Sequence, residues 1–261
     1  MKTSMKTLAL GIALALGSGS AAAINVGGVV WDPDSIFDFS STDTMIEKGA
    51  FVVGDVLNGY AKITAMNGET NTNAFCPGCE VTYAFSGYTV TSATATTLTF
   101  SGGTINVYVD STPNYNSLLQ STAVDGVLFL SLSAPVFYDA AAGGLGTLFS
   151  DPVPASTGVA GDGRGFLDVT GGLAAANFNT NTLPIQTDLA GTVGYADFQF
   201  TSSFQLLPGG ASFVSDNGVR YNLFGSNDIQ GNSIPEPGSL ALLGIGLAGL
   251  GMSFSRRRKS A

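Results

Sequence analysis

Apolar and polar residues alternate along several segments of the chain. The clearest alternation lies in residues 196–206, where three phenylalanines and a leucine share one face while glutamine, threonine and serine take the other. Residues 80–86 and 104–110 have the same period of two, which is typical of antiparallel β-strands with one buried face. Residues 127–132 form a nearly continuous apolar run, and we expect them to be a central strand.

Turn signals support the same fold class. Asn-Gly pairs at 58–59 and 217–218 separate apolar-rich segments, and each pair predicts a hairpin because Asn-Gly favours tight turns between antiparallel strands. Residues 140–165 are rich in Gly, Ala and Pro, so we expect a long loop or an irregular edge. Residues 24–233 show no convincing capped helical stripe. The pattern predicts an all-β domain over 24–233, folded as an antiparallel, jelly-roll-like β-sandwich.

The first 23 residues differ in pattern from the rest. Lys2 and Lys6 precede an apolar stretch at 8–16, and small residues follow as far as Ala23. This order is typical of a secretory signal peptide, here cleaved after Ala23. The alternative, an N-terminal anchor, is disfavoured because the apolar core is too short to span a membrane. We therefore expect residues 1–23 to direct export through the secretion translocon.

Residues 234–261 contain three ordered elements, namely a Pro-Glu-Pro triplet, an apolar run at 240–254 and a basic cluster that ends in Lys259. Proline disfavours helix in the residue before it, so the triplet stays extended and open to a processing enzyme. The apolar run predicts one short hydrophobic helix that inserts transiently into the membrane, with its basic end held in the cytoplasm. The predicted sorting and processing residues are Pro235, Glu236, Pro237, Arg256, Arg257 and Arg258.

The order of triplet, hydrophobic segment and arginine cluster resembles the PEP-CTERM sorting signal. The resemblance implies that exosortase, a membrane-embedded processing enzyme, recognises this tail and cuts it near the triplet. It also implies a final location at the cell surface or in the extracellular matrix. The alternative interpretation is a plain single-span tail anchor that contains an accidental Pro-Glu-Pro.

Removal of both terminal segments changes the charge of the protein. The whole chain has a formal charge of −9, but 18 of its 19 carboxylates and only four of its ten basic residues lie in residues 24–234, which gives −14 for this body. Such a surface repels nucleic acid and anionic polymers unless cations intervene. We therefore expect no nucleic-acid partner.

Cys76 and Cys79 are the only cysteines, in the string Phe-Cys-Pro-Gly-Cys-Glu at 75–80. In an oxidising compartment they predict a local disulfide, which on the chain-entropy model contributes about 2 kcal/mol. A redox-active pair is the alternative, but that motif begins a helix, whereas this one precedes the predicted strand 80–86. A zinc site is disfavoured because the chain has no histidine and no second cysteine pair.

The residue inventory limits the chemistry that the chain can perform. The absence of histidine removes Ser-His-Asp and Cys-His catalysis, and no sequence feature marks a carboxylate pair for glycoside hydrolysis. Asp32, Asp34 and Asp38 form a cluster, and Asp162 lies in a glycine-rich string, but neither matches a calcium loop. We predict no catalytic residue, no metal site and no cofactor, and thus a protein that is not an enzyme.

Trp31, the sole tryptophan, stands beside Asp32. An aromatic face next to a polar group suits the stacking of a sugar ring, which would make Trp31 a carbohydrate platform. The favoured interpretation is a tryptophan that packs at the edge of the sandwich.

Three strings in the body carry a second resemblance: Val-Trp-Asp-Pro-Asp-Ser at 30–35, Phe-Cys-Pro-Gly-Cys-Glu at 75–80 and Leu-Phe-Gly-Ser-Asn-Asp at 223–228. They are similar to strings of the flocculation-associated PEP-CTERM proteins of floc-forming bacteria. This resemblance implies a matrix protein that promotes floc or biofilm formation with exopolysaccharide. The alternatives are a lectin-like module that binds a defined sugar and, less favoured, a carboxylate-dependent polysaccharide hydrolase.

Overall fold

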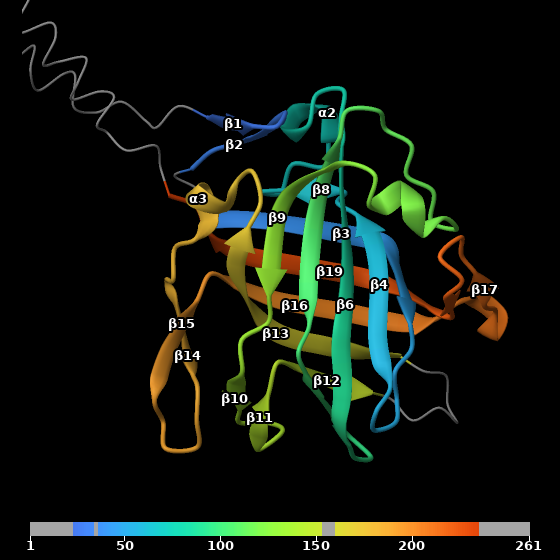
Figure 1. Ribbon diagram of the computed structural model, residues 1–261, viewed down its shortest axis with the longest axis vertical. Helices are drawn as coiled ribbons and strands as arrows, with labels where there is room; N and C mark the ends of the chain where they lie inside the picture. The colour runs from blue at the N-terminus through green and yellow to red at the C-terminus, as the bar shows by residue number, and fades with distance from the viewer. Residues whose placement is uncertain (1–22, 34–35, 153–159, 235–261) are drawn as a thin grey trace, which may run out of the picture.

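The computed structural model describes residues 23–33, 36–152 and 160–234, and its regular structure is almost entirely β-strand (Figure 1). The long strands are β3 (Ile36–Lys48), β4 (Val56–Lys62), β6 (Glu80–Ala93), β8 (Thr104–Asp110), β9 (Val127–Ser133), β13 (Ala160–Gly171), β16 (Phe198–Leu206) and β19 (Leu223–Asn232). The short strands are β1 (Ile24–Val26), β2 (Val29–Trp31), β5 (Ala65–Met66), β7 (Leu98–Ser101), β10 (Phe137–Asp139), β11 (Gly144–Gly146), β12 (Leu148–Pro152), β14 (Leu183–Gln186), β15 (Val193–Ala196), β17 (Phe213–Val214) and β18 (Arg220–Tyr221). Single helical turns occur at α2 (Thr72–Phe75), η1 (Gln120–Ala123), α3 (Ala175–Phe178) and η2 (Pro208–Gly210).

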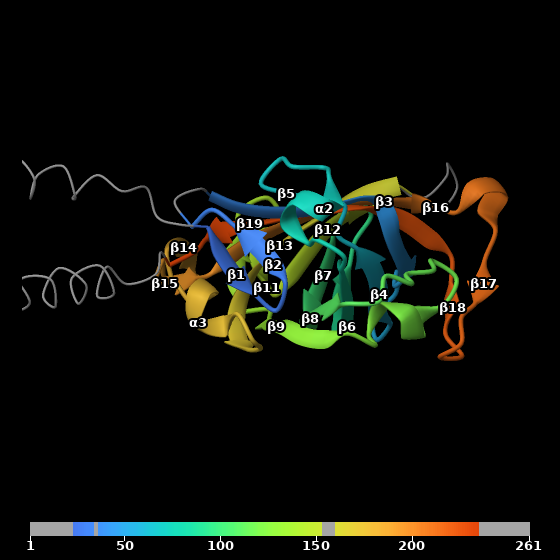
Figure 2. The same ribbon diagram turned by 90° about the horizontal axis from the view of Figure 1, so that it is seen from above.

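Eight antiparallel strands close into a barrel. Their order is β6, β4, β3, β19, β16, β13, β9 and β8, and β8 pairs with β6 to complete the circuit. The short strands β7 and β12 pair with each other and join other parts of β6 and β13, so they bridge the same two strands a second time. Figures 1 and 2 show β3, β19, β16 and β13 in one layer and β6, β8 and β9 in the other, with the strands of the two layers crossing.

The predicted antiparallel all-β body is confirmed, but one sheet closes on itself where a jelly-roll sandwich would have two separate sheets. Register shifts interrupt the pairing of β19 with β3, of β4 with β6 and of β13 with β9. Such bulges bend and twist long strands, so that one strand serves both layers. A strand in a sandwich and a strand in a barrel have the same period of two, so the alternation alone did not separate the two architectures.

The individual strand predictions fare unequally. Residues 80–86 and 104–110 lie in β6 and β8, and most of 196–206 forms β16. Residues 127–132 fall in β9, but Val127 and Leu128 are exposed, so this strand is buried only from Phe129 onward.

Only one of the two Asn-Gly pairs makes a turn. The pair at 217–218 lies in the turn between β17 and β18, where Gly218 has a φ of 78°. The hairpin predicted at 58–59 is wrong, because Asn58 and Gly59 lie inside β4. A Cβ atom on Gly59 would be 2.4 Å from the carbonyl oxygen of Ile46 and 2.2 Å from the Phe85 ring, so glycine serves close packing here.

The predicted loop at 140–165 is also partly wrong, because it contains β11, β12 and the start of β13. Two glycines of β13 in this segment permit close strand pairing. A Cβ on Gly161 would lie 2.7 Å from the Asp151 carbonyl oxygen, and one on Gly165 would lie 3.0 Å from that of Thr147. The small residues that suggested irregular structure therefore let β12 approach β13 closely.

One part of the core is a cluster of aromatic rings, formed by Trp31, Phe37, Phe39, Phe129, Phe178 and Phe198. The ring centroid of Trp31 is 5.0 Å from that of Phe178 and 6.0 Å from that of Phe37, and Trp31 is only 3% exposed. Trp31 is therefore a core residue, as the favoured interpretation held, and it offers no face for stacking a sugar.

A buried polar contact joins the two layers of the barrel. The Tyr83 hydroxyl on β6 donates a hydrogen bond to Asn227 Oδ1 on β19, and the Ser41 hydroxyl on β3 donates to the same oxygen. All three side chains are buried. A buried network of this kind fixes how the two layers register against each other.

The predicted disulfide is confirmed, since Cys76 and Cys79 are bonded. The bridge follows α2 and directly precedes β6, so it clamps the entry into a central strand. Within the described ranges, no helix is long and apolar enough to cross a membrane. The hydrophobic helix predicted at 240–254 lies outside these ranges, as does the signal peptide apart from Ala23.

Candidate functional site

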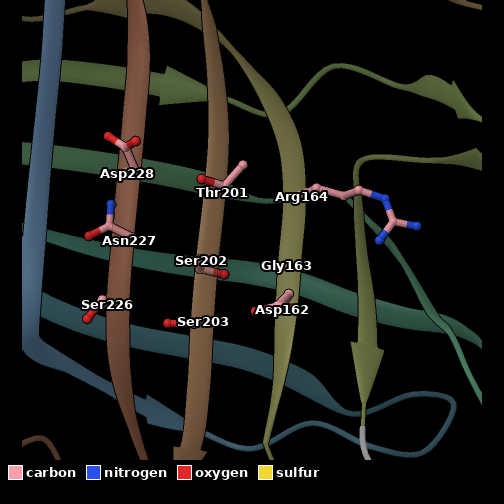
Figure 3. A pocket seen from close by; sticks show the side chains of 9 residues that line it. All are labelled: Asp162, Gly163, Arg164, Thr201, Ser202, Ser203, Ser226, Asn227 and Asp228. Atoms are coloured by element: carbon pink, nitrogen blue, oxygen red, sulfur yellow. The ribbon is translucent and has the colours of Figure 1, made fainter.

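The outer surface of β13, β16 and β19 carries a shallow groove of about 500 Å³ lined by polar residues (Figure 3). Alternate residues of these strands point outward because their neighbours fill the barrel interior. The strand register aligns the outward residues in rows across the three strands. We call six of them the polar face: Asp162, Ser203 and Ser226 in one row, and Arg164, Thr201 and Asp228 in the next.

Arg164 is held at the edge of the polar face by two carboxylates. Its Nε donates to Asp139 Oδ2 at 2.6 Å, and its Nη1 donates to Asp151 Oδ2 at 2.6 Å. These hydrogen bonds keep the pKa of Asp139 below its usual range. Figure 3 shows the Arg164 side chain directed away from β16 and β19. The polar face therefore presents hydroxyls and carboxylates, while its arginine links β13 to β10 and β12.

Asp38 on β3 and Asp228 on β19 form a carboxyl pair at the other edge of the polar face. Desolvation, followed by a hydrogen bond with Asp228 and repulsion from its charge, raises the pKa of Asp38 to about 7. Gln230 Nε2 donates to Asp228 Oδ2 at 2.8 Å.

The polar face continues into a second, more acidic groove of about 390 Å³, where Asp43 and Asp151 join Asp162. In the part of the chain that the structure describes, no group of three His, Cys, Asp or Glu residues could hold a metal ion. Of the acidic residues considered for calcium, Asp32 is exposed, Asp38 belongs to the carboxyl pair and Asp34 lies outside the described residues.

This arrangement suits many weak polar contacts. A shallow surface with hydroxyl and carboxylate groups can exchange hydrogen bonds with an extended hydroxylated polymer. Acyl-transfer chemistry requires a nucleophile beside a general base. The hydroxyls of Thr201, Ser203 and Ser226 have no histidine to act as that base, because the chain contains none.

Sequence reasoning found two of the six residues of the polar face. Thr201 and Ser203 belong to the wet face that the alternation in 196–206 predicted. Asp162 and Ser226 were not linked to it, because their place beside β16 follows from long-range strand register. One signal was available in the sequence, namely glycine at every second position from 161 to 165. This pattern indicates a closely packed strand whose intervening residues, Asp162 and Arg164, point outward.

The predicted sorting residues Pro235, Glu236, Pro237, Arg256, Arg257 and Arg258 lie outside the described residues. Ala23, the predicted cleavage site, is exposed directly before β1. The body ends close to the tail, since β19 finishes at Asn232 and the Ile234 amide donates to the Asn177 carbonyl oxygen at 2.7 Å. The described contacts of the barrel therefore reach Ile234, the first residue of the predicted sorting segment.

Comparison with known proteins identifies the C-terminal segment. No curated protein and no solved structure matches the chain, so the resemblance of the body to floc-associated proteins stays a prediction. Residues 233–259 match the PEP-CTERM protein-sorting motif. This motif implies processing by exosortase, with export and a transient C-terminal membrane anchor before release to the surface or matrix. The chain thus carries the sorting signal of an exosortase-processed extracellular PEP-CTERM protein.

Proposed function

We propose that this protein is an extracellular matrix component that promotes floc or biofilm formation together with exopolysaccharide. The observation that carries the proposal is the sorting motif at residues 233–259, because it assigns the body to the cell exterior. The composition of that body supports the proposal, since a net charge of −14 favours solubility and repels nucleic acid.

The polar face provides the contact with polysaccharide in this proposal. Its hydroxyls and carboxylates each form weak hydrogen bonds, and many copies of the protein along one polymer add their contacts by multivalency. The protein acts by abundance and placement and performs no catalysis. Its partners are then exosortase and the translocon during export, and the exopolysaccharide matrix afterwards.

Deletion of the gene tests this proposal in the producing cells. Flocs should be lost while polysaccharide is still secreted, and the wild-type gene should restore them. Flocs that persist unchanged after deletion would contradict the proposed matrix role.

A substitution set locates the contact. A triple variant with Thr201→Ala, Ser203→Ala and Ser226→Ala should retain less polysaccharide than the wild type in a pull-down of purified exported protein. The matched control is a triple variant of exposed hydroxyls elsewhere, Ser92→Ala, Ser101→Ala and Thr112→Ala, which should bind as the wild type does. Equal losses in both variants would assign the contact to the whole surface and not to the polar face.

A further inference from the structure

A third groove lies on the opposite layer of the barrel, over the outer surface of β4, β6 and β8. It has a volume of about 460 Å³, within the range of roughly 300 to 1,000 Å³ that small-molecule sites occupy. Its polar lining consists of Asn58, Ser86, Asn106, Tyr108, Gln120, Asn217 and Tyr221, and among the described residues no charged one lines it. We call it the amide groove.

The wall of the amide groove is built by hydrogen bonds between η1 and the turn at 215–218. The Gln120 amide donates to Ser215 Oγ at 2.8 Å, and Ser215 Oγ donates to the Leu118 carbonyl oxygen at 3.0 Å. The Ser121 amide donates to the Asp216 carboxylate at 3.3 Å. These contacts connect segments that are 95 to 97 residues apart in the chain, so the wall is formed before any ligand arrives.

Two tyrosines fasten the same wall to the barrel. The Tyr60 hydroxyl on β4 donates to the Ser117 carbonyl oxygen at 2.8 Å, and its ring meets the Tyr221 ring edge-on at a centroid distance of 5.1 Å. The Tyr221 hydroxyl in turn accepts a hydrogen bond from Asn217 Nδ2 at 2.8 Å. Asn217 is therefore held in one orientation at the rim of the groove.

The remaining polar groups of the groove are available to a ligand. The side chains of Ser86, Asn106, Tyr108 and Gln120 make no hydrogen bond with the described residues, and each is partly exposed. Asn106 and Tyr108 alternate with the buried Ile105 and Val107 along β8, so the strand itself directs them outward. A rigid floor and a fixed wall thus present unsatisfied donors and acceptors at defined places.

The chemistry of this lining selects an uncharged, hydroxyl-rich ligand. Side-chain amides and hydroxyls both donate and accept hydrogen bonds, as sugar hydroxyls do. An anionic sugar would lose its hydration in the groove without a cationic side chain to compensate for it. It would also be repelled by the net charge of −14 that the body carries. We propose that the amide groove binds uncharged sugar units of a polysaccharide, with Asn106, Tyr108 and Gln120 as its direct contacts. The site stands on its own geometry and rests on the proposed function only for the source of the glycan.

Binding of the purified exported protein to an array of neutral and uronic-acid glycans tests this proposal, followed by titration of the strongest neutral glycan. We expect saturable binding to neutral glycans and none to uronic-acid chains. Asn106→Ala and Tyr108→Phe should each weaken binding about tenfold, the effect of roughly 1.4 kcal/mol of lost hydrogen bonding. Thr104→Ala is the matched control, because Thr104 is exposed on the same strand and does not line the groove, and it should bind as the wild type does.

Three results would overturn the proposal: binding to no neutral glycan, equal binding to uronic-acid chains, or binding that survives both groove substitutions. Thermal unfolding of each variant separates loss of fold from loss of contact, and Tyr108→Phe retains the ring in case Asn106→Ala unfolds. The floc assay separates the two proposals. Flocs that depend on the gene but form normally with Asn106→Ala, together with a negative array, would refute the amide groove and leave the matrix role standing.

Discussion

Glu47 is a carboxyl group buried in a small apolar cavity of about 30 Å³ at one end of the barrel. It makes no hydrogen bond with the described residues, and desolvation raises its pKa to about 8, from a usual value of 4.5. The folded protein therefore keeps a proton that the unfolded chain releases near pH 4.5. The contribution of Glu47 to the free energy of unfolding therefore falls by a few kcal/mol as pH rises from about 4.5 to about 8, and it is constant above pH 8.

The melting temperature of Glu47→Gln tests this pH dependence. The wild type should melt at a lower temperature at pH 8.5 than at pH 5. The variant should show a smaller difference because its side chain carries no proton to release, and the raised pKa of Asp38 accounts for a remainder. The exposed Glu69→Gln serves as the control and should keep the wild-type slope. Parallel pH profiles for the wild type and Glu47→Gln would show that burial of this carboxyl does not govern stability.

Gly59 supplies a test of close packing inside β4. A methyl group at this position would overlap the Ile46 carbonyl oxygen and the Phe85 ring, so Gly59→Ala should destabilise the protein by about 1 to 3 kcal/mol. Gly144→Ala is a suitable comparison, because a Cβ there meets no atom within 4 Å. Chemical denaturation measures both variants. The packing argument fails if the two glycines tolerate alanine equally.

At the scale of elements, the sequence specified strands better than their connections. The alternation in β8 and β16 reports which face is buried, and this holds in any two-layer fold. An Asn-Gly pair reports only that the backbone can turn. Gly59 is required by the neighbouring β3 and β6, and such a neighbour is invisible in a local pattern. Closure of the barrel has the same origin, because it requires β3 to pair with β19 from the opposite end of the chain and β8 to pair with β6.

Arg164 tests how β10 and β12 are held against β13. Arg164→Gln removes its ion pairs with Asp139 and Asp151. Because the arginine is partly exposed, we expect a modest loss of about 1 kcal/mol. Hydrogen exchange should quicken in residues 137–151 and stay unchanged in β3 and β19. Arg220→Gln is the control, since within the described ranges the Arg220 side chain makes one hydrogen bond, from Nη1 to Ser212 Oγ, and no ion pair. Faster exchange spread evenly over the whole barrel would contradict this local role.

At the scale of the whole molecule, the terminal segments and the body differ in charge. The segments at 1–23 and 234–261 carry six of the ten basic residues, and the chain between them is an acidic barrel with two unlike polar surfaces. The polar face contains carboxylates, whereas none of the described residues that line the amide groove is charged. This difference follows from strand register, which is why the sequence indicated the destination of the protein but not how these two surfaces are assembled.

Glu236→Ala tests whether the Pro-Glu-Pro triplet is read as a signal. The variant should keep its tail and collect in the membrane fraction, because the processing enzyme no longer recognises the motif. Glu69→Ala, which alters an exposed carboxylate of the body, should be released as the wild type is. Normal release of Glu236→Ala, measured by fractionation and immunoblotting, would favour a plain tail anchor.

Mass spectrometry of the protein recovered from outside the cells is the most decisive test of export and tail processing, because it reads both termini and any added mass. We expect a chain that starts at Ile24, ends near residues 235–237 and lacks the basic cluster at 256–259. An extracellular protein that still carries Arg256, Arg257 and Arg258 would contradict it.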